Sequence, residues 1–556
     1  MRVRISKIRP RINPLRLESI KRSYGESAYE FSQNTTLNAW RFIGDRHISI
    51  FERVFFLIAF ICASALALNF IFDLYQKWSA TPVIISNSAS ASYISQIPFP
   101  AVTICNMNQA VKSRVSSMNR TSPNYSILQV LCNRQHDIDT TNVSSKWNDF
   151  EEFIFQSTQP CHRMLMFCMF GSKPFNCTDL FTPVLTDEGL CCAFNTVESK
   201  QMFKNASDHV YTAPKSNKYV AVPWTPESGY PKALPNDYYP AAAIGTGYSM
   251  GLTVILNAEI AEYYCSSTNG AGFKFLLHSP IETAEVGDNG FSLQVGHETR
   301  AVISPIVSEA TDTIRDLSQR DRQCLFNSEI DLSYFKTYSQ RNCELECEAR
   351  QIAERCKCIM HYMPRVIPEI AICSVRDMPC VQAADGKAQI ANQNGNNCSQ
   401  DCIAACFDIT YYVKTFSAPI LRGAFALKHN ALQRVPRDYA EKNLAVAHFY
   451  YTYNSFRSRV RQQYVGFTDV LSNTGGLMGL FVGFSVISVV EVLYYGTLRP
   501  YCVSRKESSQ AEHTPAVKTR MSKCMSMRSS DDVRKCDSEM LRRFEENMEE
   551  IKRLRD

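Results

Sequence analysis

Residues 472–495 read SNTGGLMGLFVGFSVISVVEVLYY and constrain the organisation of the whole chain. Within them, the 19 residues 477–495 form an apolar run. As a helix this run would be about 28 Å long, close to the roughly 30 Å hydrocarbon core of a bilayer. Glu491 is its only formally charged side chain. A carboxylate facing lipid costs about 2.5 kcal/mol or more, so Glu491 is expected to face a bundle interior or water, as in a pore.

Gly483, Phe484 and Ser485 stand in the middle of this run. A glycine allows the helix to open into extended backbone, whose carbonyl groups can replace water around an ion. Irregular backbone at this depth persists only where it lines a cavity or is buried in protein. The alternative is that the small residues only let two helices pack closely, which is common in membranes. The run by itself leaves both interpretations open.

A second apolar run, residues 54–72, reads VFFLIAFICASALALNFIF and contains no charge. Tyr75 and Trp78 follow it, where an interfacial aromatic belt is expected. The run begins too far into the chain for a cleaved signal peptide. Residues 1–53 hold 11 Lys or Arg against 5 Asp or Glu, which predicts a cytoplasmic N-terminus. Two spans then return the C-terminus to the cytoplasm.

These observations predict a membrane protein of the α+β class, with two transmembrane helices flanking a large disulfide-rich extracellular domain. The expected segments are a cytoplasmic segment 1–53, a transmembrane helix 54–74, an extracellular domain 75–470, a pore helix 471–495 and a cytoplasmic tail 496–556. Membrane lipid is therefore an expected partner. The formal net charge of +6 is modest, and no nucleic-acid partner is expected.

Cysteine usage agrees with this placement. Of 22 cysteines, 18 lie between Cys105 and Cys406, and an even number in an oxidising compartment predicts up to nine disulfides. In the helix-like stretch CELECEARQIAERC, Cys343 and Cys347 share one face. A zinc site is the alternative interpretation of such a cluster, but the segment is extracellular and has little histidine besides His361. Disulfides are favoured, and neither a metal nor a cofactor is predicted.

Six Asn-x-Ser/Thr sequons in the same segment predict N-glycosylation. They are Asn119, Asn124, Asn142, Asn176, Asn205 and Asn397.

The remainder of the extracellular segment has β character. Residues 99–106 (FPAVTICN) and 251–260 (GLTVILNAEI) are rich in β-branched and apolar residues. Residues 247–251 (GYSMG) match the G-x-S-x-G form of a hydrolase nucleophile elbow, but that elbow must lead from a strand into a helix. Here a strand-like sequence follows, and no HExxH, P-loop or dinucleotide fingerprint is present. The sequence does not predict an enzyme.

At this point the chain resembles the epithelial sodium channel and degenerin superfamily, most closely its insect pickpocket branch. The resemblance rests on FPAVTICN after the first span, YSQRNCELECEARQIAERCKCIMHYMP at residues 338–364, and the second span itself. It implies a plasma-membrane trimer, homomeric or heteromeric, whose second spans surround a pore for sodium ions. It also implies an extracellular domain with a β core and disulfide-bound helical lobes.

By position, the resemblance assigns roles within the second span. Residues 483–485 match the selectivity filter, and Glu491 matches the acidic residue inside the pore. Ser472 falls on the degenerin position, where a bulky side chain holds the gate open. Gly479 matches the amiloride-contact position. Asp469, near the outer end, is expected to add negative charge there.

One departure from the family concerns a gating motif ahead of the first span. The family usually has T-x-H-G-x-R-Y-I, whereas this chain has TTLNAWRFIG, with Asn38 and Ala39 in place of His and Gly. Ala39 cannot enter positive φ as freely as glycine. Low open probability alone, or dependence on a partner subunit, is therefore expected. The alternative is ordinary variation in a divergent branch.

Three functions stay open at this stage. The first is a sodium-selective, amiloride-sensitive, non-voltage-gated cation channel of a sensory or epithelial cell. The second is a subunit that conducts only in heteromers, which Asn38 and Ala39 favour. The third is a two-span, disulfide-rich receptor without a pore. The sequence GFS and the isolated Glu491 argue against the third, because a passive membrane anchor gains nothing from them.

Overall fold

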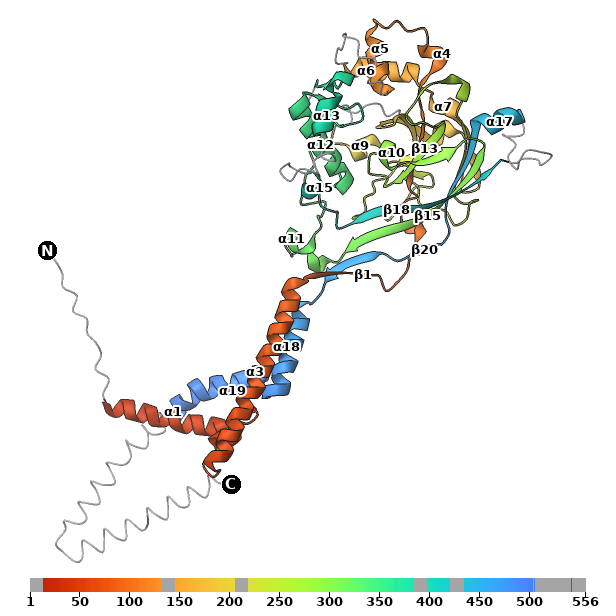
Figure 1. The fold of residues 1–556 in the computed structure, drawn as a ribbon. Helices are drawn as coiled ribbons and strands as arrows, with labels where there is room; N and C mark the ends of the chain where they lie inside the picture. The colour runs from red at the N-terminus through yellow and green to blue at the C-terminus, as the bar shows by residue number, and fades with distance from the viewer. Residues whose placement is uncertain are drawn as a thin grey trace, which may run out of the picture. The chain divides into compact units, whose positions relative to one another are not determined.

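The structure is a computed structural model, and the chain divides into two compact units (Figure 1). It describes residues 14–132, 146–205, 219–365, 367, 369–384, 398–420, 435–503, 505 and 542. The helical unit is built from residues before Thr81 and after Tyr464, and the α/β unit spans Thr81–Tyr464.

The helical unit brings the two ends of the chain together. Its helices are α1 Pro14–Asn34, α2 Trp40–Gly44, α3 Ile50–Ala80, α18 Phe467–Val482 and α19 Val486–Leu493, followed by the π-helical turn η6 Tyr494–Leu498. Helices α3 and α18 pack side by side (Figure 1), and Phe70 stacks on Phe481 with 5.8 Å between ring centroids. The apolar run 54–72 lies inside α3, and the second apolar run is divided between α18 and α19.

Among the described residues, α3 is the one unbroken helix that is long and apolar enough to cross a membrane. Most of its large apolar side chains are exposed, and such exposure suits an apolar surrounding. The second apolar run meets the same criteria only as a bent pair, α18 followed by 486–503, with an angle of 67° at the break. The expected single helix over 471–495 is therefore two helices, because residues 483–485 leave the helical conformation.

Two β-sheets form the centre of the α/β unit. The strands of the larger are β1 Val83–Asn87, β5 Leu165–Phe170, β6 Lys173–Phe175, β11 Leu252–Asn257, β15 His297–Ala310, β18 Asp408–Pro419, β19 Leu444–Tyr451 and β21 Arg459–Gln463. They follow the order β1-β21-β15-β19-β11-β5-β6, with β18 paired to β15. The edge strand β1 follows α3 along the chain and pairs antiparallel with β21, which precedes α18; Ile85 lies opposite Arg461.

The smaller sheet contains β3 Ala101–Asn106, β7 Phe181–Thr186, β8 Gly189–Phe194, β13 Gly272–His278 and β14 Phe291–Gln294, in the order β14-β13-β3-β8-β7. The stretches 99–106 and 251–260 thus provide β3 and β11, as their composition predicted. The 247–251 sequence leads into strand β11 and not into a helix, so a nucleophile elbow is not formed.

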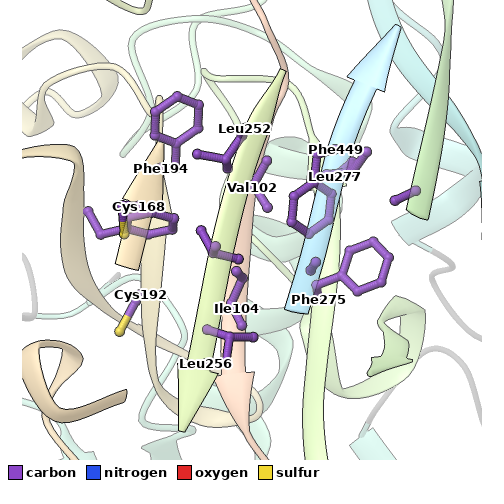
Figure 2. Close-up of a cluster of buried hydrophobic side chains, with 14 of the residues drawn as sticks. Val102, Ile104, Cys168, Cys192, Phe194, Leu252, Leu256, Phe275, Leu277 and Phe449 are labelled. Atoms are coloured by element: carbon purple, nitrogen blue, oxygen red, sulfur yellow. The ribbon is translucent and has the colours of Figure 1, made fainter. Parts of the chain in front are cut away.

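The main hydrophobic core is drawn from both sheets. Leu252, Val254 and Leu256 of β11 alternate into it and are fully buried, as expected for one face of a pleated strand. Figure 2 shows Leu252 and Leu256 beside Ile104 of β3 and Phe449 of β19. The opposite face of β11 carries Ile255, which belongs to a separate small cluster.

Helical lobes surround these sheets (Figure 1). The helices are α4 Lys112–Val115, α5 Pro123–Leu131, α6 Trp147–Ser157, α7 Cys161–Met164, α8 Cys177–Leu180, α9 Ser199–Met202, α10 Val286–Asn289, α11 Gln319–Arg322, α12 Gln340–Cys356, α13 Met378–Ala384, α15 Cys398–Asp401 and α17 Arg437–Asn443. The predicted helical stretch CELECEARQIAERC lies within α12.

All 18 cysteines of the α/β unit form disulfides, which confirms the predicted nine. The pairs are 105–191, 132–265, 161–192, 168–177, 324–406, 343–402, 347–398, 356–380 and 358–373. Cys343 and Cys347, one helical turn apart on α12, pair with Cys402, just after α15, and with Cys398 of α15. The cluster that suggested zinc as an alternative is therefore fully used in disulfides.

Four of the six predicted glycosylation sites lie on exposed residues. These are Asn119, Asn124, Asn176 and Asn205. Asn142 and Asn397 fall outside the described residues.

Candidate pore site

The break in the second apolar run is formed by a glycine and a serine. Helix α18 ends at Gly483, which has φ 74° and donates its N–H to the carbonyl of Gly479 at 3.0 Å. A left-handed residue commonly ends a helix, and glycine adopts this conformation without steric cost. Ser485 has extended backbone, φ −131° and ψ 171°, and is the N-cap of α19. Phe484 is thus held between two helix ends.

The cap at Ser485 is reciprocal. The Ser485 hydroxyl accepts from the backbone N–H of Ser488 at 3.3 Å, and the Ser488 hydroxyl accepts from the N–H of Ser485 at 3.0 Å. This is the arrangement of a capping box, with serine in the place of the usual Glu or Gln. Ser488 has no exposed surface. The capping serine is therefore fixed by a buried side chain one turn away.

Residues 35–38, between α1 and α2, lie directly against this break. The backbone N–H of Asn38 donates to the carbonyl of Val482 at 3.0 Å. The Thr36 hydroxyl bonds to the Ser488 hydroxyl at 2.8 Å. A Cβ on Gly483 would lie 2.8 Å from the Asn38 side chain. The N-terminal segment thus contacts both the end of α18 and the start of α19.

The same segment binds the acidic residue of the span. Glu491 accepts from the Thr36 N–H at 3.0 Å, from the Thr35 hydroxyl at 3.1 Å and from the Thr36 hydroxyl at 3.3 Å, all at Oε2. Glu491 therefore meets polar groups of the N-terminal segment of this chain.

Ala39 follows this contact and has φ 69° and ψ −24°. It adopts the left-handed conformation that its side chain disfavours, at a position where the related family usually has glycine. Its carbonyl accepts from Phe42 and Ile43 and begins α2. The strained residue is therefore the one that turns the chain from the break into α2.

Aromatic and ionic contacts hold the surrounding helices in place. Phe31 of α1 packs edge to face against Trp40 and Tyr495, with centroid distances of 6.2 and 5.7 Å. Glu30 accepts two hydrogen bonds from the Arg499 guanidinium, at 2.6 and 2.7 Å. Such a bidentate pair fixes geometry more firmly than a single contact. Helix α1 and the end of the second apolar run are therefore joined.

The residues predicted at the outer part of the span lie apart from the break. Asp469 accepts from the Gly466 N–H at 3.0 Å and so caps the start of α18. Ser472 and Gly479 are exposed on α18. A Cβ on Gly479 would have only the Phe484 carbonyl within 4 Å, at 3.8 Å. Space beside α18 is thus open at the position matched to amiloride contact.

Three participants were missed by sequence reasoning: Thr35, Thr36 and Ser488. Their partners lie more than 450 residues away in the chain, so no local spacing could have shown them. The available signal was the run TTLNAWRFIG, whose first two threonines are the residues that reach Glu491. Among the described residues, no group of three or more His, Cys, Asp or Glu side chains is placed to hold a metal.

Comparison with known proteins gives a family match over most of the chain. A family model described as amiloride-sensitive sodium channel matches residues 31–495. Pickpocket protein 28 of Drosophila melanogaster is 42% identical over 485 residues, covering 86% of this chain and 79% of that protein. Human acid-sensing ion channel 2 is 23% identical, covering 84% and 85%. The rat bile acid-sensitive ion channel is 24% identical, covering 76% and 77%.

Proposed function

Because the chain belongs to the amiloride-sensitive sodium channel family and to its insect pickpocket branch, we propose that it is a subunit of a sodium-selective, amiloride-sensitive, non-voltage-gated cation channel. Members of this family are ion channels of the plasma membrane and not enzymes. The proposed topology has two spans, α3 and the bent pair α18–α19, with both termini in the cytoplasm.

The break at residues 483–485 is the observation that carries this proposal. Backbone that leaves the helix within an apolar span must line a cavity or be buried in protein. Here Gly483 and Ser485 each adopt a defined non-helical conformation, and a second segment of the chain holds the break from one side. Several such breaks around one axis would form a narrow ring lined by carbonyls and a hydroxyl, which is suited to strip water from a small cation.

Three copies would complete the site. One chain supplies a single wall, and a trimer would bring three copies of residues 483–485 around one axis. Three Glu491 carboxylates would then follow along the same path and exclude anions. Asp469 would contribute negative charge nearer the outside, where surface carboxylates attract cations.

Voltage-clamp recording in oocytes tests the proposal. The chain is expressed alone, and currents are measured in sodium and then potassium, with and without amiloride. Ser472→Val is compared with the matched small-residue control Ser472→Ala. We expect a sodium-selective, amiloride-blocked current that is larger in Ser472→Val than in Ser472→Ala. A current that does not distinguish sodium from potassium would contradict the proposed selectivity.

A second candidate function is supported by Ala39. An alanine at φ 69° carries backbone strain that glycine would avoid. This strain opposes the contact between residues 35–38 and the break, which favours a subunit that conducts only beside a partner with a less strained loop. In that case neither Ser472 variant produces current when the chain is expressed alone, even though the protein is present at the cell surface. Co-expression with a related subunit then produces current that depends on Gly483 of this chain.

A further inference from the structure

The α/β unit contains a cavity of about 270 Å³ beside the β5–β6 hairpin. Its floor includes Phe170 of β5 and Phe194 of β8, both buried in the main core. Its remaining walls come from α8 and from β10 Tyr238–Tyr239, which pairs with β9 Val220–Ala221. Small-molecule sites usually occupy about 300–1,000 Å³, so this cavity suits a small ligand and not a folded partner.

Specific contacts fix the walls of the cavity. The Asn195 side chain donates to the carbonyls of Phe99 and Ala241, at 2.5 and 3.0 Å, and accepts from the Ala241 N–H at 2.6 Å. These bonds hold the segment after β10 against the floor. The disulfide between Cys168 and Cys177 joins β5 to α8. The cavity is therefore built into the fold and does not need a ligand to form.

The hairpin turn beside the cavity also requires a specific residue. Gly171 has φ 57°, and a Cβ there would lie 2.3 Å from the Ile244 side chain. Glycine avoids the strain of positive φ, and a larger residue would also have to displace the end of the exposed Ile244 side chain. The β5–β6 turn thus packs tightly on Ile244, another residue of the cavity lining.

The lining combines aromatic rings with two carboxylates. Tyr219, Tyr238 and Phe175 are half-buried in the walls. Asp179 and Asp237 also line the cavity, and within the described ranges neither carboxylate has a hydrogen bond or ion pair. Burial, with the charges of Asp237 and Asp179, raises the pKa of Tyr219. Both carboxylates therefore lie close enough to Tyr219 to affect the pKa of its hydroxyl.

We propose that this cavity binds a small organic cation, with its ammonium group near Asp179 and Asp237 and its apolar body against the aromatic rings. Aromatic faces attract cations, most strongly where water is excluded. The two carboxylates, which have no partner among the described residues, add a charge-assisted contact. Lys173, also in the lining, is exposed, as is Asp237, whereas Asp179 is half-buried. Among the described lining residues, one lysine against two carboxylates gives a net negative charge, which disfavours an anionic ligand. This inference is independent of ion conduction, because binding is measured on the purified chain.

Calorimetry on the purified full-length chain in detergent tests this site with 2-phenylethylamine as the probe. Its neutral analogue 2-phenylethanol has the same body without the charge. We expect saturable binding of the amine at one site per chain and at least tenfold weaker binding of the alcohol. Equal affinities for the two probes, or no saturable binding of the amine, would overturn the proposal.

Three variants separate the site from general effects on folding. The double change Asp179→Asn with Asp237→Asn is expected to weaken amine binding at least tenfold. Asp316→Asn changes an exposed aspartate outside the cavity and is expected to leave binding unchanged. Lys173→Gln is expected to strengthen binding about twofold, a direction that structural damage would not produce. Wild-type affinity in the double variant, or weaker binding in Lys173→Gln, would refute the assigned charges.

Discussion

Replacing Ala39 with glycine should strengthen the contact between the N-terminal segment and the break in the second apolar run. Ala39 has φ 69°, and an L-residue in the left-handed region costs roughly 1–2 kcal/mol. Glycine removes this cost but gains about 0.5–1 kcal/mol of backbone freedom when the segment is undocked. The net gain is about 0.5–1 kcal/mol, a two- to fivefold shift toward the docked segment.

The assay is sodium current at a fixed voltage in oocytes, divided by surface protein measured on the same cells. If the docked segment supports conduction, Ala39→Gly should raise this ratio two- to fivefold. Ala39→Val should lower it, because a β-branched residue tolerates positive φ less well than alanine. Where wild-type current is too small to measure, both changes are compared in the Ser472→Val background.

A matched control distinguishes relief of strain from a general effect of glycine. Ala28 is exposed on α1 and has no positive φ. Glycine at this position costs about 1 kcal/mol of helix stability and relieves no strain. Ala28→Gly is therefore expected not to increase current. An unchanged or smaller current in Ala39→Gly, at equal surface protein, would refute the role assigned to the strained loop.

Three further predictions follow from individual contacts. Thr36→Val removes a hydroxyl bonded to Glu491. In a double-mutant cycle with Glu491→Gln, measured by relative open probability, the coupling energy between the two residues should be about 1–2 kcal/mol. Additive effects of the two substitutions would contradict this contact. Gly483→Ala imposes roughly 1–2 kcal/mol of φ strain at the break and should reduce current at equal surface protein. Thermal stability of the purified chain should fall less between pH 6.5 and pH 4 in His361→Phe than in the wild-type protein. An equal fall in the two proteins would contradict this prediction.

The His361 prediction depends on burial. The ring stacks on Phe150 and both ring nitrogens are buried, so burial outweighs the opposing effect of the Thr186 backbone. Burial lowers its pKa from 6.5 to about 4. The unfolded chain therefore binds an extra proton between these values, so this contribution to stability is complete above pH 6.5 and is lost as pH falls toward 4. At pH 4 the loss approaches about 3 kcal/mol.

Local patterns predicted the elements of this fold well. The cysteine spacing and helical composition of residues 343–356 predicted a stapled helix, and α12 carries the staples. The apolar β-branched run at 251–260 predicted β11. Gly483 indicates a place where the second apolar run can open, because glycine allows the backbone to leave the helix. Close helix packing is the alternative, and the segment 471–495 is expected as one helix but forms two. Each of these signals lies within one element and needs no distant partner.

Long-range pairing could not be predicted in the same way. Cys132 pairs with Cys265 across 133 residues, and the number of connectivities among 18 cysteines is far too large for spacing to select one. The contact of Thr36 with Ser488 has the same character, since it joins opposite ends of the chain. Side-chain chemistry at either end is compatible with many partners, and only the packed fold selects among them.

The divergent motif at Asn38 and Ala39 lies in direct contact with the break in the second apolar run. The backbone of Asn38 bonds to the last residue of α18, and Ala39 then turns the chain at a cost that glycine would not incur. The threonines just before them hold Glu491. A strained turn and an acidic side chain are thus coupled through one short segment, so the stability of the turn affects both the break and the carboxylate. A single substitution at Ala39 should therefore alter conduction without changing any residue of the second apolar run.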